Sequence, residues 1–91
     1  MEESDAFKVA EDYLSGRNLE VFDCFDRSFD EAARLPDVFF DETSVRGLVV
    51  RNVWAFSFAM YPPPPVGTVR SGGSCIVYVD SDSGDCGFFS C

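Results

Sequence analysis

The spacing of apolar residues changes several times along this chain, and its first segment has the period of a helix. An apolar stripe at intervals of three and four residues runs through residues 4–16: Ala6, Val9, Ala10, Tyr13 and Leu14. Ser4 is a candidate N-cap, and Gly16 follows the last apolar position. The pattern predicts an amphipathic helix over residues 4–16 that lies on another element.

Residues 48–61 have the alternation of a β-strand. Bulky side chains occupy one set of alternate positions, namely Trp54, Phe56, Phe58 and Met60. Small ones occupy the other set, namely Val53, Ala55, Ser57 and Ala59. We expect a central strand whose aromatic face meets the helix. Two shorter apolar runs, 75–79 and 86–89, flank a Ser-Gly turn at 80–85 and predict a hairpin.

The region between the helix and residue 48 is less regular. Leu19, Val21 and Phe22 indicate a first, edge strand within 19–26. Ser28 and Glu31 have capping-box spacing, which predicts a short helix over 29–35 that Pro36 ends. Residues 38–40 are apolar and predict a short strand. Residues 62–73, which begin with four prolines, predict a loop.

Together these elements predict an α+β fold. An N-terminal helix would pack on an antiparallel sheet of about four strands, with a short helix inserted between strands. The chain has 91 residues, which is enough for one domain, 1–91, with one core. Ten Phe, three Tyr and one Trp can fill that core with few side chains.

The chain is strongly acidic, which limits its partners. Sixteen Asp and Glu oppose seven Lys and Arg, for a net charge of −9. This charge disfavours direct binding to nucleic acid or anionic lipid and favours a basic protein partner, although solubility alone is an alternative explanation. The N-terminus has no signal-peptide pattern and no apolar run approaches a membrane span, so we expect a cytoplasmic protein with its four cysteines reduced.

Candidate chemistry is sparse. The chain contains no His, so the commonest general base is missing, and no cysteine has a specific partner that would activate its thiol. We therefore predict no enzymatic activity, no catalytic residue and no cofactor. Residues 80–85, Asp-Ser-Asp-Ser-Gly-Asp, resemble the start of a calcium loop, but Gly84 is at the fifth position, not the sixth. A hairpin turn is the preferred interpretation, and no metal site is predicted.

The acidic residues are concentrated in one segment, between residues 20 and 42. Eight acidic residues oppose Arg27 and Arg34 there, a local balance of −6. Aromatic residues are interleaved with them, as in a protein interface where rings bind and charges steer. The alternative is that the rings point inward and the acids are only solvated. The predicted partner-binding residues are Glu20, Asp23, Phe25, Asp26, Asp30, Glu31, Asp37, Asp41 and Glu42.

Two segments carry a resemblance to a known family. Val53-Trp54-Ala55-Phe56-Ser57-Phe58 and residues 72–80, Gly-Gly-Ser-Cys-Ile-Val-Tyr-Val-Asp, followed by a Ser-Gly-Asp turn, resemble small bacterial toxin-immunity proteins of the YrhB-like, cystatin-like type. The resemblance implies a cytosolic protein that binds and neutralises a cognate toxin domain, or another protein with a basic cleft. The alternatives are a phage-type anti-defence inhibitor that mimics nucleic acid and a small-ligand or calcium-binding module.

Overall fold

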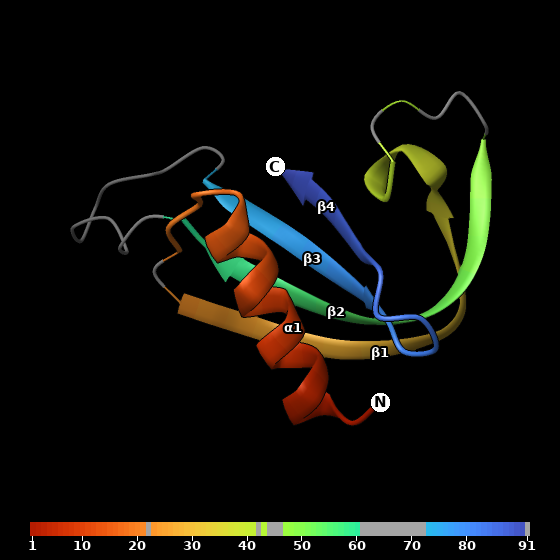
Figure 1. Ribbon diagram of the computed structural model, residues 1–91, viewed down its shortest axis with the longest axis horizontal. Helices are drawn as coiled ribbons and strands as arrows, with labels where there is room; N and C mark the ends of the chain where they lie inside the picture. Colours follow the sequence, from red (N-terminus) through yellow and green to blue (C-terminus); the bar gives the residue numbers. More distant parts are fainter. Residues whose placement is uncertain (22, 42, 44–46, 61–72, 91) are drawn as a thin grey trace, which may run out of the picture.

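The computed structural model describes residues 1–21, 23–41, 43, 47–60 and 73–90. One helix lies across one face of a single antiparallel sheet whose strand order is β1-β2-β3-β4 (Figure 1). The predicted α+β class is confirmed. In chain order the elements are α1 (Glu3–Gly16), β1 (Asp23–Pro36), the 3₁₀ turn η1 (Asp37–Phe39), β2 (Leu48–Ala59), β3 (Ser74–Asp80) and β4 (Cys86–Ser90).

The helix α1 follows the predicted apolar stripe, but it begins earlier than predicted. Glu2, not Ser4, is the N-cap residue, and the Ala6 N–H donates to the Glu2 carbonyl to close the first turn. Ser4 therefore lies inside the helix. The end at Gly16 is as predicted, because the next residues fold back so that the Leu19 N–H reaches the Leu14 carbonyl.

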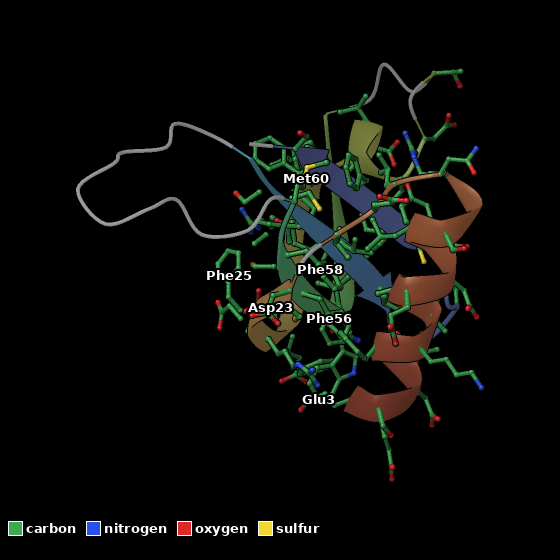
Figure 2. All side chains as sticks on the ribbon, turned by 90° about the vertical axis from the view of Figure 1, so that its left-hand side faces the viewer. Glu3, Asp23, Phe25, Phe56, Phe58 and Met60 are labelled. Carbon is green, nitrogen blue, oxygen red and sulfur yellow. The ribbon has the colours of Figure 1, made fainter. Side chains whose placement is uncertain are left out.

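The core lies between α1 and the sheet. Phe56 and Phe58 are buried on the helix side of β2, and the ring of Phe7 on α1 lies 5.3 Å and 5.9 Å from theirs. Figure 2 shows both β2 rings directed towards the helix. The expectation that the aromatic face of this strand meets the helix is confirmed. Burial of each such ring stabilises the fold by about 1.5–3 kcal/mol.

Strand β1 replaces two predicted elements. The predicted helix over 29–35 is wrong, because these residues continue β1 and pair with β2 as far as Pro36 opposite Leu48. The first strand also begins later than predicted, at Asp23. Pairing with β2 extends from Asp23 to Pro36, and this long-range pairing overrides the local capping signal of Ser28 and Glu31.

The second face of the sheet is partly covered by η1. The strand predicted at 38–40 is wrong, since Asp37–Phe39 form a single 3₁₀ turn. The Phe39 ring stacks 5.8 Å from Tyr78 and lies 5.1 Å from Phe89, both on the face away from α1. Figure 1 shows the far ends of β1 and β2 bending towards η1. At Gly87 a Cβ atom would lie 3.0 Å from the Phe40 ring, so a larger residue there would require the ring to shift.

The C-terminal hairpin agrees with the prediction. Strands β3 and β4 include the predicted runs 75–79 and 86–89, and the turn between them includes Gly84 at a positive φ of 79°. The loop predicted for 62–73 lies, except for Gly73, outside the described residues.

Candidate functional site

Three of the predicted acidic residues come together on one face of the sheet. Asp23, Asp26 and Asp30 are exposed on β1 and lie opposite Ala59, Ser57 and Val53 of β2. These β2 positions alternate with the buried aromatic ones, so the three carboxylates face away from α1. Figure 2 shows Asp23 on the side of the sheet away from the helix. We call Asp23, Asp26 and Asp30 the acidic row.

The surface beside the acidic row is low and open. On β2 the neighbouring side chains on this face are Ala55, Ser57 and Ala59, all half-buried. On β3 the next positions are Ile76 and Tyr78. Small residues beside the row leave the carboxylates projecting above the sheet, where another molecule can reach them.

One aromatic residue accompanies the acidic row. Phe25 occupies a β-bulge between Cys24 and Asp26, and 61% of it is exposed. The extra residue at a bulge re-aims a side chain, and Figure 2 shows Phe25 on the same side of the sheet as Asp23. The structure thus places one exposed ring beside the carboxylates of the acidic row.

The other predicted residues do not join the row. Glu31 is exposed at a second irregularity of β1, between Asp30 and Ala33. Glu20 lines a hollow of about 350 Å³ beside the end of α1, together with Glu11. Asp37 and Asp41 belong to the η1 region, where the Asp41 carboxylate accepts hydrogen bonds from Thr43. Glu42 lies outside the described residues.

Arg27, one of the two basic residues within the acidic segment, faces the other way. Arg27 lies between Asp26 and Asp30 in sequence, but its partner Phe56 places it on the helix side of the sheet. Its guanidinium donates to Glu3 at 3.3 Å and lies 4.2 Å from the centre of the Phe7 ring. The hydrogen bond to Glu3 raises the pKa of Arg27. Within the described ranges, no cation pairs with the acidic row.

A second polar cluster lies at the β3–β4 turn, where the sequence of residues 80–85 indicates a calcium-type loop or a hairpin turn but no connection with Arg51. The Arg51 guanidinium donates to Asp80 at 2.8 Å and to Asp85 at 3.2 Å, and it lies over the Phe40 ring at 4.3 Å. Burial tends to raise the pKa of Asp80, but hydrogen bonds from Asp82, Ser83 and Arg51 outweigh it and lower this pKa. The sequence signals were the acidic turn at 80–85 and a charged Arg within an apolar strand, but nothing in the sequence indicated that they pair.

This cluster leaves little room for calcium. One oxygen of Asp80 accepts the N–H groups of Asp82 and Ser83, and the other accepts Arg51. A cation at the turn would have to displace the guanidinium, whose charge repels it. In the part of the chain that the structure describes, no group of three metal-ligating side chains is suitably placed.

Of the cysteines in the described part of the chain, Cys86 is poorly suited to act as a nucleophile. Cys24 and Cys86 are free thiols. Burial, together with the charge of Asp85, raises the pKa of Cys86 to about 11. At neutral pH this thiol stays protonated, and a protonated thiol is a poor nucleophile.

Comparisons with known proteins identify no relative: no protein family, no curated protein and no solved structure is significantly similar to this chain. Of the helices in the described ranges, none has both the length and the hydropathy of a membrane span.

Proposed function

We propose that this chain is a non-enzymatic binding protein whose acidic row docks on a basic surface of a partner protein. The observation that carries the proposal is that β1 presents three carboxylates, none of them paired with a described cation, on one open face. Carboxylates held in this way attract a basic surface over about 8–10 Å at physiological salt. Phe25 supplies the apolar contact that such interfaces need at their centre.

The narrower proposal follows from the resemblance to toxin-immunity proteins. A toxin that acts on an anionic substrate has a basic cleft, and a row of carboxylates can occupy it in place of phosphates. We therefore propose a cytoplasmic inhibitor that neutralises a cognate toxin domain. Because long-range attraction accelerates encounter, association should slow as salt is added.

The test compares the removal of charge from the acidic row with the removal of the same charge from the helix region. Replacing Asp23, Asp26 and Asp30 with Asn removes three charges from the acidic row. The matched control, Glu2→Gln with Asp5→Asn and Asp12→Asn, removes three exposed charges from the helix region. Its net charge therefore equals that of the triple Asn variant. Each form is used to capture proteins from the native host, and a captured protein is then purified for measurement of association rates and inhibition.

We expect the wild type and the control to bind the same basic partner and to inhibit it stoichiometrically. The triple Asn variant should associate at least roughly tenfold more slowly at low salt and show a weaker salt dependence. Thermal unfolding checks that all forms remain folded. Equal binding by the triple variant and the control would show that the acidic row is not the interface.

A further inference from the structure

The outer edge of β1 is open to another strand. β1 is the terminal strand of the sheet, and none of the described strands pairs with its outer side. Residues 25–32 are all exposed. An edge strand offers a row of backbone N–H and C=O groups that can form a ladder with an added strand.

The regular part of this edge is short and well defined. Bulges at Phe25 and at residues 31–32 bound a stretch, Asp26–Asp30, that pairs with β2 without interruption. Within it the Arg27 N–H donates to the carboxylate of Asp26 at 3.0 Å, which places this N–H on the outer side of the strand. Because the groups of an antiparallel strand alternate, the N–H of Phe29 faces outward too.

The side chains of this stretch differ between its two faces. Asp26 and Asp30 lie on the open face, four positions apart, with Ser28 between them. On the helix side Arg27 is already paired with Glu3, while Phe29 lies against Trp54 and remains 45% exposed. An added strand would therefore meet two carboxylates on one face and an apolar ring on the other.

We propose that the partner binds by adding an extended segment to the outer edge of β1 as a fifth strand. The segment carries Lys or Arg opposite Asp26 and Asp30, with apolar residues beside Arg27 and Phe29. The incoming carbonyl takes the Arg27 N–H, and the released Asp26 carboxylate pairs with the incoming cation. This inference rests on the proposed function, since it assumes a basic partner. A second copy of this chain would place its own carboxylates against the row, which like charges oppose.

The probe is the peptide acetyl-Lys-Val-Thr-Val-Lys-amide, whose lysines match the spacing of Asp26 and Asp30. In antiparallel register its two Val N–H groups face the outward carbonyls of Arg27 and Phe29. A second peptide, N-methylated at both Val residues, keeps every side chain and charge but loses these two donors. Amide exchange of the intact protein is followed by NMR as each peptide is titrated to millimolar concentration.

We expect the unmethylated peptide to slow exchange of the Arg27 and Phe29 amides by roughly threefold or more, and the methylated peptide to leave both rates unchanged. A double variant, Asp26→Asn with Asp30→Asn, should lose the protection, whereas Asp5→Asn with Asp12→Asn should retain it.

The outcomes separate the two proposals. If both peptides bind equally and only the double variant Asp26→Asn with Asp30→Asn reduces their binding, strand addition is wrong. The acidic row then remains a charge-based site. If the unmethylated peptide protects neither amide in the wild type, strand addition is also wrong, and the partner-capture test alone then decides the proposed function. Sedimentation without peptide identifies the remaining alternative, since a dimer that protects the same amides would assign the edge to self-association.

Discussion

At the residue scale, Asp80 makes several polar contacts at the β3–β4 turn. Its carboxylate accepts two turn N–H groups and the Arg51 guanidinium, and only 6% of the residue is exposed. Through Arg51 and the Phe40 ring, this carboxylate links β2, the β3–β4 turn and the segment after η1. A charge held by that many donors stabilises the fold only while it is ionised.

We expect Asp80→Asn to lower the free energy of unfolding at pH 7 by about 2–3 kcal/mol, because Asn keeps the turn hydrogen bonds but loses the charged one. In the folded wild type the pKa of Asp80 lies below its ordinary value of 3.8. The contribution of the charge is therefore fully present above pH 3.8 and disappears as the pH falls through the lower, folded-state pKa. Urea unfolding between pH 7 and pH 2 should show the free energies of unfolding of the wild type and Asp80→Asn converging as the pH falls.

The control for this prediction is Asp85→Asn. Asp85 contacts the same Arg51, but 62% of its side chain is exposed, so its ion pair contributes less than about 1 kcal/mol. A loss at pH 7 that is as large for Asp85→Asn as for Asp80→Asn would contradict the assignment of the buried charge to Asp80.

At the scale of elements, β1 is shaped by its two bulges. The second one holds Ala32 at a φ of 53°, a left-handed conformation that favours glycine, and its N–H donates to the Asn52 side chain. This irregularity separates the stretch that carries the acidic row from the distal end of β1, which bends towards η1 (Figure 1). Bulges of this kind commonly increase the local bend of a strand.

We expect Ala32→Gly to raise the free energy of unfolding by about 0.5–1 kcal/mol, because glycine adopts a positive φ without a steric cost. The neighbouring change Ala33→Gly is the control, since Ala33 has no positive φ and glycine in a regular strand is destabilising. Chemical denaturation measures both. Equal destabilisation by the two changes would mean that Ala32 carries no backbone strain.

At the scale of the whole molecule, the sheet has two unequal faces. The helix covers one face with a continuous core that includes Phe56, Phe58 and Val77. The other face is covered in part by η1, through Phe39 on Tyr78 and Phe89, and elsewhere carries the acidic row. The continuous core therefore lies on one side of the sheet, and the acidic row lies on the other.

This asymmetry predicts different effects for two ring truncations. Phe56→Ala should lower the free energy of unfolding by about 3–5 kcal/mol, because it leaves a cavity in the core. Phe39→Ala should cost less and should speed amide exchange mainly in η1 and β4, since the ring packs at the edge of the fold. Denaturation combined with amide exchange tests this, and equal global losses would show that both faces form one core.

Local sequence patterns determined the elements that have a clear period. The helical stripe, the alternation from Trp54 to Phe58 and the hairpin around Gly84 each match the structure because burial of one face requires that spacing. The acidic segment and its Phe residues could also be recognised from the sequence, because the local composition of a chain does not depend on its fold. The sequence did not show which of these side chains share a surface.

Only the tertiary structure decided the conformation of residues 29–40 and the membership of the acidic row. Pairing with β2 overrode the capping signal at Ser28, so residues 29–35 form part of a strand. Phe39 lies in a 3₁₀ turn, where its ring contacts Tyr78. Strand alternation, together with the bulge at Phe25, then placed Asp23, Asp26 and Asp30 on one face and turned Arg27 to the other. Such choices depend on residues distant in sequence, and a local pattern contains no information about them.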